Sequence, residues 1–176
     1  MKIYLASDHA GFELKEEIKK FLTIANYQVE DCGAFKLDET DDYPDFIKKA
    51  AEAVSNCAQG KYSSHPERSE GSQDSSASPQ NDSGCRGIVF GGSGQGEAMV
   101  ANRYKNVRAA VYYGSPGFTK RTGAEIIKLS REHNDANILS LGARFISKKE
   151  AVEVVDLWLK TQFSKKERHQ RRINKF

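Results

Sequence analysis

The stretch RGIVFGGSGQGE, residues 86–97, decides the fold class expected of this 176-residue chain. Its first part, residues 86–92, is an apolar run that predicts a buried strand, and a helix is expected from about Gln95 to Arg103. Glycines between a strand and a helix permit a tight turn and let backbone N–H groups approach an anion. The stretch therefore predicts a strand–turn–helix unit with a candidate anion site, although such turns also occur without a ligand.

Strands and helices alternate on both sides of this unit. Further strands are expected at residues 2–7, 27–33, 107–113 and 136–142, and further helices at residues 11–26, 43–58, 124–132 and 147–163. Ser147 and Glu150 form a capping-box pattern that marks the start of the last helix. Alternating elements of this length predict an α/β fold, with a five-stranded parallel sheet and helices on both of its faces.

One polar stretch interrupts this pattern. Residues 59–84 are rich in Ser, Gln, Asp, Asn, Pro and Gly and hold almost no apolar side chain. Such a segment buries too little surface to offset the entropy lost when it becomes ordered. We therefore expect a single domain over residues 1–176, with a disordered insert at about 59–84.

The composition argues against several classes of protein. No run of about 18 apolar residues occurs and the N-terminus lacks a secretory apolar region, so we expect no membrane span and a cytoplasmic protein. Cys32, Cys57 and Cys85 are too few for a disulfide framework or a zinc site, and reduced thiols are expected. Cys57 and Cys85 bracket the polar stretch and could approach each other, but no bond between them is expected.

The net charge of +3 is unevenly distributed along the chain. Residues Lys160 to Phe176 carry seven basic side chains and a single acidic one, Glu167. A basic tail of this kind indicates an anionic partner, which is either a phosphate group on a small molecule or a nucleic-acid backbone.

The carboxyl ends of the expected strands should carry the ligand site, because ligands of parallel α/β sheets bind at that edge. Asp8 and His9, the loop Gly91–Glu97 and the region after Tyr113 all follow strands, so we expect them to meet there. Asp8 is expected to accept a hydroxyl group of the ligand, and His9 to help to bind a phosphate. A helix cap and a surface histidine are the alternative interpretation of this pair.

Glu97 lies at the end of the glycine-rich loop, in the first turn of the expected helix. A carboxylate at such a position often only complements the helix dipole. Here it follows a run of amides that could stabilise an oxyanion, and proton abstraction beside a carbonyl needs a base next to such a site. The loop fits neither a dinucleotide fingerprint, whose third glycine would fall on Glu97, nor a Walker A loop, which ends in Lys-Ser/Thr.

Further candidate residues lie in the second half of the chain. His133 could protonate a ring oxygen, because a histidine side chain can exchange a proton under physiological conditions, and Arg144 follows the last expected strand. Arg168 and Arg172 would share one face if the tail is helical, and could clamp a phosphate. Each arginine could equally be a solvated surface charge. No group of histidines and carboxylates has metal-ligand spacing, so neither a metal nor a cofactor is expected.

Together these motifs resemble the ribose-5-phosphate isomerases of type B, a family that also includes galactose-6-phosphate isomerase subunits. The resemblance extends over the whole chain except about residues 59–84. The motifs that carry it are SDHAG (7–11), DYP (42–44), the loop 91–97 followed by Ala101-Asn102, REHNDAN (131–137), LGAR (141–144), and Arg168-His169 with Arg172.

The resemblance implies a three-layer α/β/α Rossmann-like sandwich, a homodimer or dimer of dimers with shared active sites, and no cofactor. Many members have a cysteine base at the position of Gly91, whereas another branch uses a glutamate that matches Glu97, and the chain resembles that branch. It further implies that Ser93 assists the reacting oxygens and that His133 opens the furanose ring. The residues that would bind the sugar phosphate are Asp8, His9, Gly92, Gly94, Gln95, Gly96, Asn134, Arg144, Arg168 and Arg172. Three of the implied site residues, His133, Asn134 and Arg144, would come from the neighbouring subunit.

The activity implied is the interconversion of ribose 5-phosphate and ribulose 5-phosphate through an enediolate, a step of the pentose phosphate pathway. Two departures from the family pattern are the insert at about 59–84, which a typical member lacks, and Lys166-Glu167, which replaces a common Gly-Gly. The segment 114–123 is also longer than usual, which leaves the shape of the rim and hence the length of the sugar open. Isomerisation of a hexose phosphate such as galactose 6-phosphate, and a sugar-phosphate sensor inactivated by the insert, are the alternatives. A nucleic-acid binder is disfavoured, because no aromatic stacking platform or helix-turn-helix pattern accompanies the basic tail.

Overall fold

The computed structural model describes residues 1–62, 84–115 and 122–176, and within these ranges it contains one five-stranded parallel sheet. The strands lie in the order β2-β1-β3-β5-β4, and every neighbouring pair is parallel. The strands are β1 (Lys2–Ser7), β2 (Gln28–Asp31), β3 (Arg86–Gly91), β4 (Ala109–Tyr112) and β5 (Ile138–Gly142).

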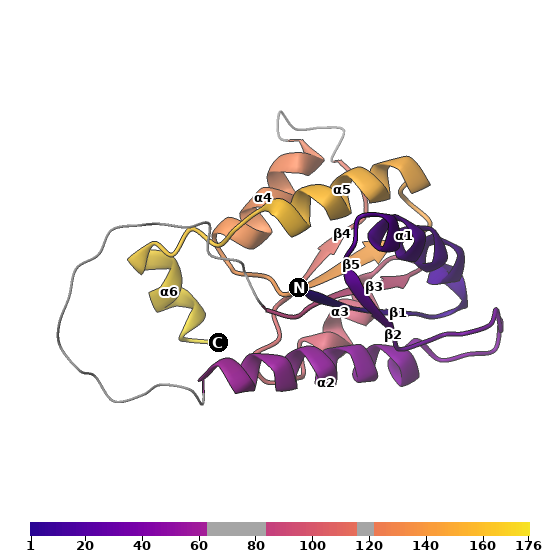
Figure 1. Cartoon of the computed structure of the whole chain (residues 1–176), viewed down its shortest axis with the longest axis horizontal. Helices are drawn as coiled ribbons and strands as arrows, with labels where there is room; N and C mark the ends of the chain where they lie inside the picture. The colour runs from indigo at the N-terminus through magenta and orange to yellow at the C-terminus, as the bar shows by residue number, and fades with distance from the viewer. Residues whose placement is uncertain (63–83, 116–121) are drawn as a thin grey trace.

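Helices cover both faces of the sheet, with α1, α4 and α5 on one side and α2 and α3 on the other (Figure 1). The helices are α1 (Phe12–Ile24), α2 (Tyr43–Tyr62), α3 (Gln95–Ala101), α4 (Gly123–Glu132), α5 (Lys148–Lys160) and α6 (Glu167–Ile173), and the 3-10 helix η1 (His9–Gly11) precedes α1. The three-layer α/β/α sandwich expected from the sequence is therefore confirmed. In the ranges described, no helix combines the length and the apolar character needed to cross a bilayer.

The sheet separates two apolar cores, because successive side chains of a strand point to opposite faces. In β1, Ile3 and Leu5 pack with α1 and α5, whereas Tyr4 and Ala6 pack with α2. Trp158 of α5 is fully buried in the first of these cores. Both faces of the central strands are thus occupied, as a continuous apolar run such as KIYLAS requires.

The strand register brings three strand ends to the same edge of the sheet. Ser7 pairs with Phe90, and Gly91 pairs with Gly142. The residues that follow β1, β3 and β5 therefore leave the sheet side by side, and they include Asp8, Gly92 and Arg144. This edge is the carboxyl edge, where the sequence predicts the ligand site.

The ends of the helices differ slightly from the predicted ranges. α1 begins at Phe12, after η1, which Asp8 caps by accepting the Gly11 N–H at 3.0 Å. Ser147 caps α5 by accepting the Glu150 N–H at 3.1 Å, but the Glu150 carboxylate accepts the Tyr112 hydroxyl at 2.7 Å. The Ser147 half of the predicted capping box is therefore present, while the Glu150 side chain connects α5 to β4.

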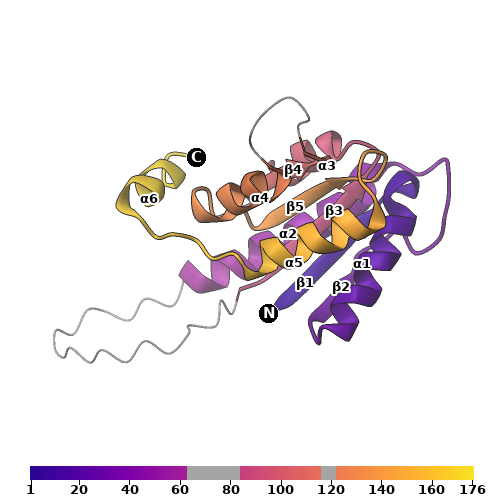
Figure 2. The ribbon, with the colours of Figure 1, turned by 90° about the horizontal axis from the view of Figure 1, so that it is seen from above.

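The α6 helix lies apart from the three layers, beyond one end of α4 (Figure 2). The backbone N–H of Ser164 donates to the carbonyl of Glu132 at 3.1 Å, and the rings of His133 and His169 lie 4.3 Å apart. The basic tail is helical from Glu167 to Ile173, so Arg168 and Arg172 lie one turn apart as expected.

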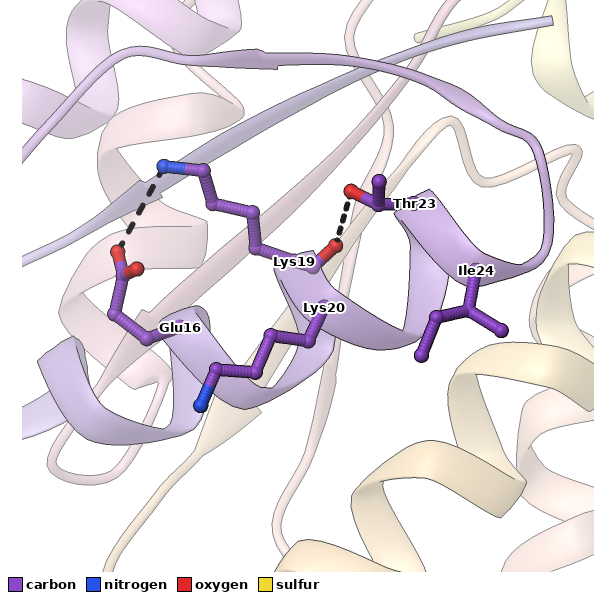
Figure 3. A pocket seen from close by; sticks show the side chains of 5 residues that line it. All are labelled: Glu16, Lys19, Lys20, Thr23 and Ile24. Carbon is purple, nitrogen blue, oxygen red and sulfur yellow. Dashed lines mark hydrogen bonds and ion pairs between the residues drawn. The ribbon is translucent and has the colours of Figure 1, made fainter.

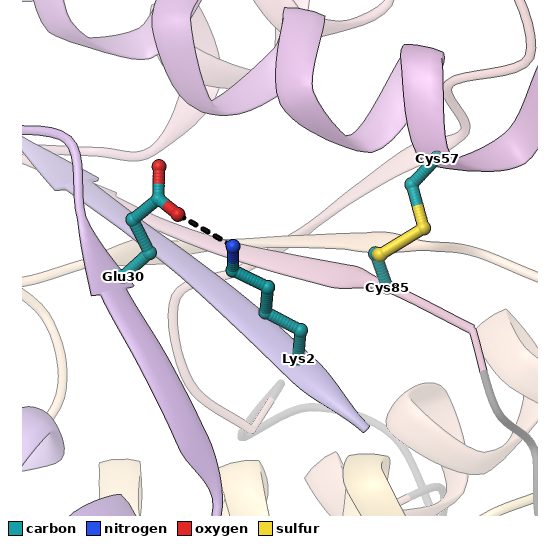
Figure 4. Close-up of a disulfide and its surroundings, with 4 residues drawn as sticks. All are labelled: Lys2, Glu30, Cys57 and Cys85. Atoms are coloured by element: carbon teal, nitrogen blue, oxygen red, sulfur yellow. Dashed lines mark ion pairs between the residues drawn. A yellow bond between two sulfur atoms is a disulfide. The ribbon is translucent and has the colours of Figure 1, made fainter.

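Cys57 and Cys85 form a disulfide between the C-terminal part of α2 and the start of β3 (Figure 4). Their Cα atoms are 6.0 Å apart, so the expectation of reduced thiols is wrong for these two residues. The reason is topological: α2 runs back across the sheet and ends where β3 begins, which the sequence spacing does not reveal. The predicted insert lies between them, almost entirely outside the described residues.

Cys32 is the free cysteine of the described residues. Burial, with smaller contributions from Glu30 and Asp31, raises the pKa of its thiol to about 11. The thiol therefore stays protonated near neutral pH and is a poor nucleophile.

Loss of the Cys57–Cys85 disulfide is expected to lower the free energy of unfolding by about 3 kcal/mol, because the bond closes a long loop in the unfolded chain. The two cysteines are 28 positions apart in the sequence. Urea unfolding of the protein with and without reductant, and of the double variant Cys57→Ser/Cys85→Ser, measures the effect. Cys32→Ser is the control, and equal midpoints with and without reductant would contradict a stabilising bond.

Candidate active site

The glycine-rich loop between β3 and α3 packs tightly against the end of β5. Gly94 has a φ of +77° at the N-cap of α3, a conformation that favours glycine. A Cβ on Gly142 would lie 2.7 Å from the carbonyl oxygen of Ser93, and the Ser140 hydroxyl donates to the Gly94 carbonyl at 2.6 Å. The exposed Ser93 hydroxyl accepts the Gln95 N–H at 3.3 Å. The loop is therefore held by close backbone contacts, at the edge where the site is expected.

Glu97 lies in the first turn of α3, and only 4% of its surface is exposed. Its carboxylate occupies the space beside Gly91, where a side chain would otherwise lie: a Cβ on Gly91 would overlap it. A glutamate that merely complements a helix dipole needs no such space and is usually solvated. The missing side chain of Gly91 thus makes room for the carboxylate of Glu97.

The pKa of Glu97 is raised above its ordinary value. Burial is the largest cause, because it disfavours the charged carboxylate, and the negative charge of Asp8 adds to the effect. Asp8 follows β1 and is itself buried, so these two carboxyl groups come from separate strand ends. A carboxyl group with a raised pKa accepts a proton more readily than an ordinary one, which suits a general base.

Arg144 lies over the glycine-rich loop of its own chain. A Cβ on Gly92 would lie 3.1 Å from Cζ of Arg144, and the Arg144 N–H donates to the Gly92 carbonyl at 3.1 Å. Its positive charge also acts on His9. The resemblance implied that Arg144 would come from a neighbouring subunit, but here it lies against the same chain's loop. Asp8, His9, the loop 92–97 and Arg144 are thus brought together at one edge.

The other predicted site residues lie at the opposite edge of the sheet. His133 and Asn134 follow α4 and precede β5, near Asn137, whose carbonyl accepts the Gly87 N–H at 2.9 Å. From Gly87 to Gly91 the parallel strand advances about 13 Å, which separates these residues from the Glu97 loop. Arg168 and Arg172 are exposed on α6, beyond the same end of α4.

His169 connects this second group of residues. Its ring contacts that of His133, its Nδ1 lies 2.7 Å from the Ser164 hydroxyl, and its Nε2 accepts from Nε of Arg168 at 3.0 Å. Burial lowers the pKa of His169, and the positive charges of nearby groups lower it further, so the ring is neutral near pH 7. Holding α6 against α4 is the structural result of these contacts.

Two residues at the carboxyl edge were not among the predicted site residues. Asp41 accepts a hydrogen bond from His9, and a Cβ on Gly96 would lie 2.8 Å from the Tyr43 hydroxyl. Tyr43 belongs to the DYP motif, so the resemblance already drew attention to its neighbourhood. Asp41 carries no separate signal, because one acidic residue among several in residues 38–42 does not stand out.

Surface features outside the carboxyl edge are weaker candidates for a ligand site. A hollow on the outer side of α1 is lined by Glu16, Lys19, Lys20, Thr23 and Ile24 (Figure 3). All five belong to one helix, so these residues line the hollow from one side. In the ranges that the structure describes, no three His, Cys, Asp or Glu side chains are grouped closely enough to hold a metal ion.

Comparison with known proteins assigns the chain to a family. The model of the family described as Ribose/Galactose Isomerase matches residues 3–63 and 73–176. The chain belongs to this family. The resemblance drawn from its motifs is thereby confirmed, whereas the bounds of the insert at 59–84 stay a prediction.

Relatives in the family are similar over nearly their full lengths. Ribose-5-phosphate isomerase B of Mycolicibacterium paratuberculosis is 38% identical over 174 residues, which cover 99% of this chain and 88% of that protein. The solved structure of ribose-5-phosphate isomerase B from Clostridium thermocellum is 38% identical with a TM-score of 0.74, covering 99% of this chain and 94% of the other. That from Mycoplasma genitalium, with ribulose-5-phosphate bound, is 33% identical with a TM-score of 0.76, covering 99% and 92%.

Proposed function

We propose that the chain is an aldose–ketose isomerase that interconverts ribose 5-phosphate and ribulose 5-phosphate. The observation that carries the proposal is the buried Glu97 carboxylate beside a glycine-rich loop, at the carboxyl edge of the sheet. The relatives named ribose-5-phosphate isomerase B support the choice of substrate, and one of their structures contains ribulose-5-phosphate. A phosphorylated sugar as substrate also supports a cytoplasmic protein.

The groups at the carboxyl edge suit a sugar phosphate. Arg144 and His9 provide positive charge and hydrogen-bond donors for the phosphate, and the amides of residues 92–96 provide donors for the reacting oxygens of the sugar. The Asp8 carboxylate accepts a hydrogen bond from a hydroxyl group of the sugar. The Tyr43 ring, which packs against Gly96, limits the space on that side of the loop.

Proton transfer then proceeds between C2 and C1 of the open-chain sugar. The Glu97 carboxylate removes the proton from C2, a C1=C2 double bond forms, and the C1 carbonyl oxygen becomes an enediolate oxygen that the loop amides stabilise. The proton of the O2 hydroxyl moves to O1, with help from Ser93. The C2 carbonyl forms as C1 takes the proton back from Glu97, which leaves ribulose 5-phosphate and an ionised Glu97.

Two copies of the chain would complete the site. His133, Asn134, Arg168 and Arg172 have the roles of ring opening and substrate binding, yet they lie at the edge of the sheet opposite to Glu97. A second copy that docks this edge over the first copy's glycine-rich loop would supply them, in a homodimer or a dimer of dimers. The separation of the two groups within one chain supports this arrangement.

Mixing two inactive variants is expected to restore activity if the sites are shared. Glu97→Gln and His133→Ala would each be inactive as pure dimers, whereas a mixed dimer would contain one site with both native residues. Mixtures refolded together should therefore recover about a quarter of native kcat, measured against each variant alone. No recovery in proven mixed dimers would place both residues of each site in one chain.

The substrate is tested by parallel assays of ribose 5-phosphate and galactose 6-phosphate on the purified protein. We expect the higher kcat/KM on the pentose phosphate. A preference for the hexose phosphate would replace the proposed substrate by the alternative one, and binding of sugar phosphate without turnover would favour a sensor.

A further inference from the structure

One carboxylate oxygen of Asp41 fixes both the backbone and the side chain of His9. Asp41 lies between β2 and α2, at the carboxyl edge of the sheet. Its Oδ1 lies 2.7 Å from Nδ1 of His9 and accepts the His9 backbone N–H at 3.1 Å. These two bonds join residues 32 positions apart. They leave the imidazole little freedom to rotate.

The geometry also defines which nitrogen of the ring faces outward. A carboxylate can only accept, so Nδ1 of His9 carries the hydrogen in this pair. Nε2 is then the ring atom left for a ligand, and 30% of the His9 side chain is exposed. A neutral ring with this tautomer would present an acceptor at Nε2, whereas a protonated ring presents a donor.

The burial of Asp41 favours the protonated ring. Only 8% of the Asp41 side chain is exposed, and its Oδ2 is buried with no hydrogen-bond partner in the described part of the chain. A charged carboxylate this deeply buried needs a compensating positive charge. Within the described residues His9 contacts the carboxylate and can carry such a charge, so the charge of the pair is balanced when the imidazole is protonated.

Among the described residues, three charged groups face His9, and each comes from a different segment. Asp41 is the strongest influence and raises the pKa of His9, and the charge of Asp8, at the end of β1, raises it further. Burial and the positive charge of Arg144, after β5, act in the opposite direction. The net result is a pKa above the ordinary value, so the ring keeps its charge to a higher pH.

We propose that Asp41 is a positioning residue that holds His9 as an imidazolium, with its Nε2–H directed at the phosphate of the substrate. Asp41 itself does not touch the substrate. The proposal rests on the proposed function, in which His9 and Arg144 bind the phosphate. It extends that function by naming the group that keeps His9 charged near neutral pH.

Asp41→Asn tests the charge while keeping the shape, because the amide oxygen can still accept from Nδ1. We expect KM for ribose 5-phosphate to rise about tenfold near pH 7.5, because less of the His9 ring is then protonated to donate a charge-assisted hydrogen bond to the phosphate, with kcat little changed. The ratio of variant to native KM should fall toward one below about pH 6, where His9 is protonated in both proteins. The titration of the substrate phosphate affects both proteins equally and cancels in this ratio.

Asp38→Asn is the matched control. Asp38 lies in the same segment, and its Oδ1 accepts from the backbone N–H and hydroxyl of Thr40, not from His9. Its KM should equal that of the native protein at every pH. A KM ratio for Asp41→Asn that does not vary with pH would overturn the proposal, because a general distortion of the site gives a constant ratio.

Titration of the His9 ring by NMR separates this proposal from the proposed function. In the native protein we expect protonated Nδ1 and a pKa above 6.5, in Asp41→Asn a lower pKa, and on adding inorganic phosphate a rise in the native value. These results would support the Asp41–His9 link even if no isomerase activity were found. An ordinary or lowered pKa in the native protein would overturn the link, and that result does not depend on whether the variant folds.

Discussion

Glu97→Gln is expected to lower kcat for ribose 5-phosphate by about a thousandfold, within the range for removal of a general base, while KM changes little. The amide is nearly the same size as the carboxylate, so the tight space beside Gly91 stays filled, but it cannot accept the C2 proton. Steady-state kinetics together with direct binding of the substrate measures the two effects separately. Loss of binding in parallel with turnover would indicate a collapsed site instead of a missing base.

The pH dependence of kcat/KM in the native protein is a second test of Glu97 as the base. Because Glu97 must be ionised to accept a proton, kcat/KM falls as the pH decreases through its pKa. Burial and the charge of Asp8 raise this pKa, so the fall should begin above the ordinary value of 4.5. Glu13→Gln is the control, since Glu13 is a largely exposed glutamate in the first turn of α1 that pairs with Lys148 at 3.6 Å. Its activity and pH profile should match those of the native protein.

Moving the base from position 97 to position 91 is expected to show that the two positions are coupled. The effects of the single substitutions on kcat/KM should not add in the double variant. Gly91→Cys alone should lower kcat/KM about a hundredfold, the loss expected when a reacting group is displaced by about 1 Å, because the new Cβ overlaps the Glu97 carboxylate. Glu97→Ala alone removes the base. The double variant Gly91→Cys/Glu97→Ala should be more active than either single variant, because the thiolate then occupies the volume that the carboxylate leaves.

A double-mutant cycle over the four proteins measures this coupling. The activity of the double variant should also rise with pH as the thiol ionises, around the ordinary cysteine pKa of about 8.5. Gly87→Ala is the control for an added side chain in β3: its Cβ would meet Ile138 and Val54, well away from Glu97. If the single effects simply add, the two positions do not compete for one volume.

The layers of the fold were predictable because they follow from local patterns. The alternation of Ile3 and Leu5 with Tyr4 and Ala6 assigns β1 to a sheet covered on both faces, and the glycine-rich stretch after β3 required a tight turn. The parallel register then brings Asp8 and the loop of Glu97 together. The helix ends were less predictable, since the side chain of Glu150 pairs with Tyr112 and does not complete the capping box.

The features that the sequence did not reveal all depend on contacts between distant residues. The approach of Asp41 to His9 depends on how the segment after β2 folds back over the edge. The Cys57–Cys85 bond depends on where α2 ends relative to β3. The position of His133, at the edge opposite to Glu97, could have been predicted from the order of the elements. A residue that precedes a strand of a parallel sheet lies at the edge opposite to residues that follow one.

The role of Glu97 is tested most directly by a crystal structure of Glu97→Gln with ribulose 5-phosphate bound. We predict that the side chain at position 97 lies within about 3.5 Å of both C1 and C2, with O1 and O2 facing the amides of residues 92–96. A sugar bound with these two carbons out of reach of position 97 would contradict the assignment of Glu97 as the base.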